Sequence, residues 1–234
     1  MHRLIIFFLT MFLAAPGLAA DIALTSYQAS YALYRGGLNV ASSELSLEQT
    51  GRYWRWRQTS KPKGIYALFS NNNLYAETTL LRHDDQYKIH NILLSDEGDD
   101  KRYENARFDW NNQQIEVQYK GKRYFETTSG EVYDSHSIHL LTAHMLKQKI
   151  QESDFYYYRR GKLAKSHLKR IGKSTLEINQ KQINVLIFEQ TTQGSRATLK
   201  YFYNPDKPLL PIKVERTKPG KKTTIMLLRS VEWR

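Results

Sequence analysis

Three histidines lie in one short segment of the chain, at His136, His139 and His144. Imidazole nitrogens are the commonest protein ligands for zinc and related metals, so this segment is a candidate metal site. On a helix His136 and His139 would share a face, but His144 would point about 140° away from His139. Because three ligands from this segment cannot converge on one ion, we expect no metal and no cofactor. We expect instead histidines that face solvent or lie beside a helix cap.

The tripeptide Asp134-Ser135-His136 contains an acid, a hydroxyl and an imidazole, the ingredients of a nucleophilic triad. Adjacent residues point in different directions, however, whereas the members of a triad converge from distant segments. The sequence also has no Gly-x-Ser-x-Gly turn of the kind that exposes the nucleophile in many hydrolases. We therefore expect Asp134 or Ser135 to cap a helix, and we assign no catalytic residue.

Paired carboxylates offer a different chemistry, because glycosidases use two of them about 5–9 Å apart. Acidic side chains such as Glu44, Glu77, Glu104 and Asp109 are spread over the first half of the chain. Their spacing in the sequence does not place any two across a cleft. A cell-envelope hydrolase that acts on glycan or peptide is therefore the alternative function and not the leading one.

Aromatic side chains in the first half of the chain are weak candidates for a ligand-binding site. The candidates are Trp54, Trp56, Tyr66, Phe69 and Tyr75. An apolar concave sheet could hold an acyl chain or a hydrophobic peptide segment on such residues. Ordinary packing between neighbouring strands would account for the same aromatics.

The first twenty residues have the layout of a secretory signal peptide. Arg3 supplies positive charge, and Leu4 to Ala15 run without a charge before Pro16 and Gly17. An apolar run of roughly 12 residues is shorter than the ~20 that cross a bilayer as a helix. We expect cleavage after Ala19, which leaves no transmembrane anchor, and export to the periplasm of a Gram-negative bacterium.

The chain is strongly basic, with 35 Lys and Arg against 23 Asp and Glu and a formal net charge of +12. Export would separate it from nucleic acid, so we expect no nucleic-acid partner. The polyanions within reach would be lipid head groups, lipopolysaccharide and acidic glycans. We expect a lipid, lipopolysaccharide or an envelope protein as partner, although solubility alone would explain the same charge.

Short alternating segments rich in Tyr, Thr, Val, Ile and Phe dominate the rest of the sequence and predict antiparallel strands. We expect them near residues 27–34, 38–49, 53–60, 74–82, 87–95, 101–110, 114–119, 123–127, 155–160, 163–171, 174–178, 183–191, 197–203, 212–216 and 223–233. Alternation in the third segment puts Trp54 and Trp56 on one face. Ile138, Leu141 and Met145 recur with helical spacing and predict one main helix at about 135–150. A short helical turn is expected at 65–69.

Several of these segments, taken in order, resemble an exported bacterial family catalogued as domain of unknown function number three thousand one hundred and eight. The pieces that carry the resemblance are Tyr31-Ala-Leu-Tyr34, Lys63-Gly-Ile-Tyr66, Asn73-Leu-Tyr-Ala-Glu77, Arg107-Phe-Asp-Trp110, Tyr133-Asp-Ser-His-Ser137 and Phe202-Tyr-Asn-Pro-Asp206. Together they span nearly the whole chain after the leader. The resemblance implies a periplasmic, β-rich protein without an assigned catalytic residue.

These observations predict a mainly β fold after a signal peptide at residues 1–19. Residues 20–234 are expected to form one β-rich domain, built as a single large curved antiparallel sheet or open half barrel. The predicted helix would pack against that sheet. The leading function is non-enzymatic binding or carriage of a hydrophobic or anionic envelope component, or of a protein partner.

Overall fold

The computed structural model describes residues 22–64, 67, 73–83, 86–97, 99, 103–178 and 180–234. The expected signal peptide and the expected turn at 65–69 lie outside these residues, apart from Ala67. The elements are β1 (Tyr27–Arg35), β2 (Leu38–Thr50), β3 (Tyr53–Pro62), β4 (Leu74–His83), β5 (Gln86–Asp96), β6 (Glu104–Asp109), β7 (Gln114–Tyr119), β8 (Lys122–Thr127), β9 (Val132–Tyr133), α1 (Ile138–Gln148), β10 (Glu152–Arg159), β11 (Lys162–Ile178), β12 (Lys181–Thr192), β13 (Thr198–Tyr203), β14 (Pro211–Thr217) and β15 (Thr224–Trp233).

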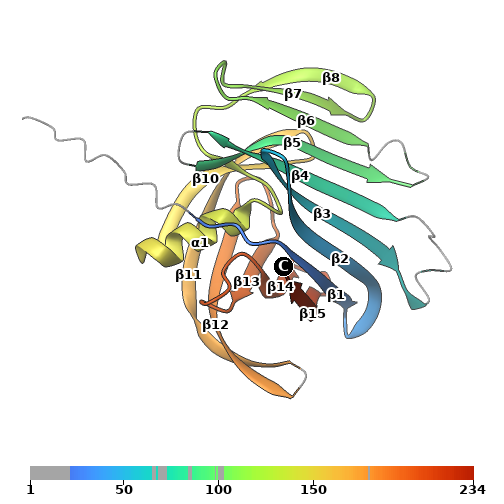
Figure 1. The fold of residues 1–234 in the computed structure, drawn as a ribbon. Coiled ribbons are helices and arrows are strands. Elements are labelled where there is room, and N and C mark those ends of the chain that lie inside the picture. The colour runs from blue at the N-terminus through green and yellow to red at the C-terminus, as the bar shows by residue number, and fades with distance from the viewer. Residues whose placement is uncertain are drawn as a thin grey trace, which may run out of the picture.

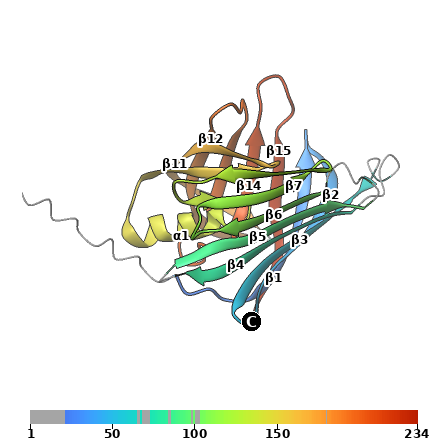
Figure 2. The same ribbon diagram turned by 90° about the horizontal axis from the view of Figure 1, so that it is seen from above.

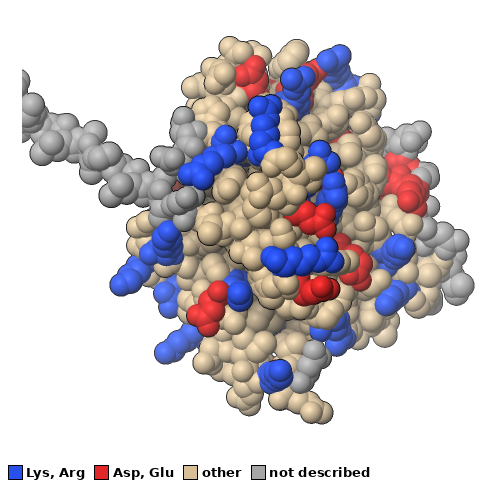
Figure 3. Space-filling model, in the orientation of Figure 1, with Lys and Arg blue, Asp and Glu red and all other residues tan. Residues whose placement is uncertain are grey.

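All these strands belong to one 15-stranded sheet in the order β8-β7-β6-β5-β4-β3-β2-β1-β15-β14-β13-β12-β11-β10-β9. The sheet consists of two up-and-down series joined where the first strand pairs with the last, with Tyr27 opposite Trp233 and Arg35 opposite Thr224. Neighbouring strands are antiparallel except β9 and β10. Figures 1 and 2 show that the sheet is strongly curled, and Figure 3 shows Lys and Arg spread among Asp and Glu over the face seen in Figure 1. The predicted curved antiparallel sheet with one helix is confirmed.

Strand alternation sorts the side chains between the two faces of the curved sheet. Leu45 and Leu47 on β2 are buried, as are Trp54 and Trp56 on β3. The predicted placement of both indoles on one buried face is therefore confirmed. The Trp56 indole N–H donates a 2.6 Å hydrogen bond to the hydroxyl of Tyr27, so this polar atom is satisfied inside the core.

Helix α1 lies on the concave side of the sheet and joins its two halves (Figure 1). Leu140 and Ala143 belong to the core built largely from the first strands. Ile138, Leu141 and Met145, the predicted apolar stripe, pack with aromatic residues of β10, β12 and β13. Seven of the eleven helical residues are buried, so the helix is part of the core on the concave side of the sheet. No helix in the described part of the chain is long and apolar enough to span a membrane.

The turn between β10 and β11 fastens the second series of strands to the edge of the first. The backbone N–H of Gly161 donates a 2.7 Å hydrogen bond to the Glu104 carboxylate of β6. The Tyr124 hydroxyl of β8 donates a 2.7 Å bond to the Gly161 carbonyl oxygen. Arg160 and Gly161 both have positive φ, at 53° and 73°, as a two-residue type I′ hairpin requires. Side chains therefore close the curved sheet at a place where no two strands pair.

Three details differ from the sequence predictions. The expected strands at 163–171 and 174–178 form one strand, β11, because a register shift between Arg170 and Gly172 absorbs the extra residue. The two-residue strand β9 was not predicted. The helix begins at Ile138 and not at Ser135, because residues 135–137 form a preceding turn.

Candidate functional site

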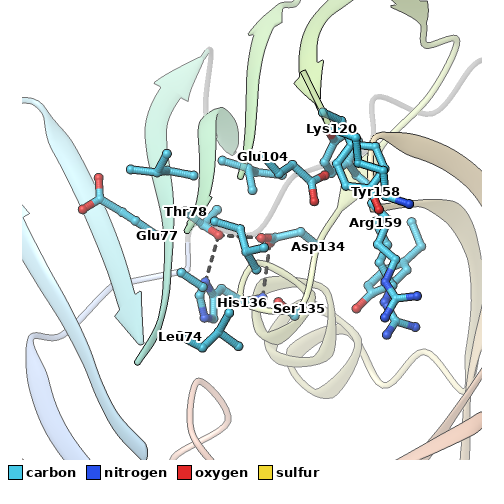
Figure 4. Close-up of a pocket in the computed structure, with 17 residues that line it drawn as sticks. Leu74, Glu77, Thr78, Glu104, Lys120, Asp134, Ser135, His136, Tyr158 and Arg159 are labelled. Atoms are coloured by element: carbon cyan, nitrogen blue, oxygen red, sulfur yellow. Dashed lines mark hydrogen bonds between the residues drawn. The ribbon is translucent and has the colours of Figure 1, made fainter. Parts of the chain in front are cut away.

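A cavity of about 510 Å³ lies between strands β4, β5 and β6 on one side and the end of β10 on the other (Figure 4). One wall is aliphatic and is formed by Leu74, Ala76, Ile92 and Leu94. The buried end is polar and contains Thr78, Asp134 and His136. Three exposed basic residues, Lys120, Arg159 and Arg160, lie on the opposite side. The cavity therefore offers an apolar wall and a cationic rim.

The alternation of β4 decides which of its side chains reach the cavity. Thr78 contacts the polar groups at the buried end. Glu77 points to the other face of the sheet, as Figure 4 shows. There its carboxylate accepts hydrogen bonds of 2.9 Å from Arg57 and 2.6 Å from the Tyr75 hydroxyl. Although its backbone borders the cavity, the Glu77 carboxylate is committed to a surface ion pair.

A hydrogen-bond chain runs through the buried end. The Thr78 hydroxyl lies 2.5 Å from Asp134 Oδ2 and 2.9 Å from His136 Nδ1, and His136 Nε2 lies 3.2 Å from Gln58 Oε1. Thr78 has one hydroxyl proton and can donate to only one of its two neighbours. The Thr78 hydroxyl donates to Asp134, so the second contact is made by the Nδ1 proton of a neutral His136.

Asp134 also holds the turn that leads into α1. Its Oδ1 accepts hydrogen bonds from the backbone N–H of His136 and of Ser137, and from the Ser137 hydroxyl. The N-cap residue itself is Ser137, whose side chain makes no cap hydrogen bond. Asp134 thus satisfies backbone donors just before the helix, close to its predicted role. Ser135 is exposed and is not the cap.

His136 and His139 are both buried, with 3% of each exposed, so neither faces solvent, but His136 directly precedes the N-cap residue Ser137 and so lies beside the helix cap as expected. Their burial could not be predicted because the groups that cover them come from distant strands. His139 Nδ1 lies 2.7 Å from the Tyr203 hydroxyl on β13, and its ring contacts Trp56 on β3. Burial lowers the pKa of His136, which the Asp134 charge partly offsets, and lowers the pKa of His139 to about 3. No cluster of metal ligands occurs among the described residues.

Tyr158 places a further polar atom at the cavity. Its side chain is buried and packs edge-on against Phe108. Its hydroxyl lies beside the Glu104 carboxylate of β6. Burial, followed by the charge of Glu104 and a hydrogen bond to it, raises the pKa of this hydroxyl, so it is neutral and can donate a hydrogen bond.

None of the three aromatic candidates that the structure describes lines this cavity. Trp54 and Trp56 lie in the core. Tyr75 points to the outer face, toward Glu77. Tyr66 and Phe69 fall outside the described residues. The sequence did not identify the cavity residues, because aliphatic, acidic and basic residues are common in any strand. Only the curvature of the sheet brings these particular residues together.

Residues 26–227 of the chain match the family of proteins of unknown function DUF3108. The match covers 202 of the 234 residues of the chain. The chain belongs to the DUF3108 family. The predicted membership is thereby confirmed. A comparison with curated proteins gives no match.

The fold of this DUF3108 chain is similar to a crystal structure of a β-barrel-like protein of domain of unknown function DUF1849 from Brucella abortus. The TM-score is 0.62 at 7% sequence identity, and the match covers 91% of this chain and 99% of the other. A candidate exported protein with a YmcC-like fold from Bacteroides fragilis matches with a TM-score of 0.31 and 5% identity, over 89% of this chain and 96% of the other. The first likeness shows the fold alone.

Proposed function

We propose that this DUF3108 protein is a non-enzymatic carrier or binding protein that holds an amphiphilic component of the cell envelope in its cavity. The observation that carries the proposal is the pairing of an aliphatic wall, at Leu74, Ala76, Ile92 and Leu94, with a cationic rim. A volume of about 510 Å³ lies within the usual range of ligand sites, about 300–1,000 Å³. An acyl chain would lie against the aliphatic wall, and its polar end would face the basic residues.

Export to the periplasm is part of the same proposal. Its support is the leader-like sequence of residues 1–19, which precedes the family match. N-terminal sequencing of the protein from a periplasmic extract tests this step. We expect the chain to begin at Ala20, and an intact leader on a cytosolic protein would contradict it.

The competing function is an envelope hydrolase that acts on glycan or peptide. In a nucleophilic triad the imidazole lies between the hydroxyl and the acid, so that the acid orients the base. Here the Thr78 hydroxyl lies between Asp134 and His136. The Glu77 and Glu104 carboxylates are also held by other groups. This order of contacts favours binding over nucleophilic catalysis.

Mass spectrometry of the lipids that copurify with the mature protein tests the carrier function. We expect a bound amphiphile in the wild type and its loss in Ala76→Phe, where the new ring occupies the cavity beside the aliphatic wall. The control is Leu38→Phe, which adds a ring to a residue that is 56% exposed and is not a lining residue of the cavity. Equal lipid content in all three proteins, or none in any, would sink the proposal.

A further inference from the structure

Four arginines occupy one rim of the curved sheet, at the ends of strands that are far apart in the sequence. Arg159 and Arg160 end β10 and begin the following turn, Arg216 is near the end of β14, and Arg35 ends β1. Arg35 and Arg216 both pair with Thr224 of β15, one from each side. Cross-strand partners point to the same face, so these two arginines share a face.

That face is the concave one. On β14, Ile212 and Val214 alternate with outward residues and pack into the two cores, so Arg216 follows them on the inner side. On β10, Phe155 and Tyr157 are the inner residues, and Arg159 follows them in the same alternation. Figure 4 shows Arg159 on the side of the cavity opposite β4. Arg159 and Arg216 therefore both lie on the inner side of this rim.

The arginines are close enough to repel one another and are not neutralised. Burial, and then the charges of Arg159, Arg160 and Arg35, lower the pKa of Arg216. None of the four forms an ion pair with a carboxylate of the described residues. The acids that border the cavity are already bonded: Glu77 to Arg57, Glu104 to the backbone of Gly161, and Asp134 to the turn before α1. A rim of uncompensated arginines is a site of strong positive potential.

We propose that Arg35, Arg159, Arg160 and Arg216 form an anion site for a phosphate group, beside the cavity that Arg159 and Arg160 line. The planar guanidinium group matches phosphate oxygens with two parallel hydrogen bonds, and several arginines together balance more than one negative charge. A single carboxylate would leave most of this charge uncompensated. If the phosphate belongs to a lipid, this inference rests on the proposed carrier function and names the head group that the carrier would bind.

Binding of three soluble probes, measured by isothermal titration, tests the site. The probes are dodecyl phosphate, 1-dodecanol and inorganic phosphate, each below the concentration at which micelles form. We expect the wild type to bind dodecyl phosphate at least about tenfold more tightly than dodecanol. The double variant Arg159→Gln/Arg216→Gln should lose that preference and keep its affinity for dodecanol. The control Lys173→Gln/Lys181→Gln removes two exposed charges from β11 and β12 and should behave as the wild type.

The outcomes separate the anion site from the carrier function. Equal affinity for both dodecyl probes in the wild type would overturn the anion site and leave the carrier function standing. If neither dodecyl probe binds but inorganic phosphate binds in an arginine-dependent way, the carrier function fails and the site is one for free phosphate. An unchanged preference in the double variant would overturn the assignment of these arginines.

Discussion

The backbone N–H of Gly161 donates a 2.7 Å hydrogen bond to the carboxylate of Glu104, although the two residues are 57 positions apart. A second bond, from the Tyr124 hydroxyl, ends on the Gly161 carbonyl oxygen. The turn at Gly161 is therefore a fastening point between the two series of strands. It also carries Arg159 and Arg160, so the closure of the sheet and the cationic rim depend on the same turn.

Replacing Gly161 by alanine should destabilise the protein by about 1–3 kcal/mol. The residue has a φ of +73°, and an added Cβ would lie 2.2 Å from the Tyr124 hydroxyl oxygen. The ring of Tyr124 would have to move, and the bond to the Gly161 carbonyl would be lost. Chemical denaturation monitored by tryptophan fluorescence measures the change in the free energy of unfolding.

Gly194→Ala is the matched control for this prediction. Its φ of +75° imposes the same backbone strain, but an added Cβ would meet no atom within 4 Å. The difference between the two variants isolates the contacts with Tyr124 and Tyr119 of the first series. Equal loss of stability in both would show that the turn does not fasten the two series.

Replacing Thr78 by valine should cost about 1–3 kcal/mol of stability. Valine keeps the shape of the side chain but leaves Asp134 Oδ2 and His136 Nδ1 without their common partner in a buried position. Thermal unfolding followed by circular dichroism measures the effect. The control is Thr175→Val, whose exposed hydroxyl bonds Asn184 and whose loss should change stability by about 0.5 kcal/mol or less. Similar losses in both variants would contradict a structural role for the buried chain.

The stability of the protein should fall when the pH drops below about 6.5. The pKa of His139 is lowered to about 3 by burial, with a smaller contribution from His136. An unfolded chain takes up a proton at His139 near pH 6.5, whereas the folded chain does not until about pH 3. The contribution of His139 to the free energy of unfolding is therefore complete above pH 6.5. It falls by up to about 1.4 kcal/mol per pH unit as the pH decreases toward 3.

Denaturation measured between pH 7.5 and pH 4.5 tests this slope. His139→Gln removes one of the two buried histidines with a lowered pKa and should reduce the pH dependence, even though it also removes the bond to Tyr203 and lowers stability at pH 7.5. Thr142→Val removes the other side-chain bond to the Tyr203 hydroxyl without removing a titrating group and should leave the slope unchanged. An unaltered slope in His139→Gln would show that another group governs the acid response.

The strands and the helix could be predicted because their signals are local. Alternation in Tyr53–Ser60 identifies β3 and its buried indoles, and the helical spacing of Ile138, Leu141 and Met145 identifies α1 and its packing face. Gly172 looked like a break between two strands. It marks a bulge within one strand, because the pairing partner β12 continues past it.

The cavity and the fate of the histidines could not be predicted, because both depend on contacts between distant segments. His136 is buried by Thr78 and Gln58 from two strands of the first series, and His139 by Tyr203 from the second. Nothing local distinguishes these histidines from exposed ones. The four rim arginines likewise come from β1, β10, the turn after β10, and β14, and only the topology of the curved sheet brings them to one rim.

Replacing Arg216 by glutamine should raise the stability of the unliganded protein slightly, by about 0.5 kcal/mol or less. Most substitutions destabilise, but here the change removes a positive charge that faces three others. The gain should shrink as salt screens the repulsion, and phosphate should stabilise the wild type more than the variant. Thermal unfolding at low and high sodium chloride, with and without phosphate, measures both effects. Lys173→Gln should show neither effect. If Arg216→Gln is instead less stable than the wild type at low salt, Arg216 has a stabilising structural role. Repulsion among the four arginines would then not lower the stability of the wild type.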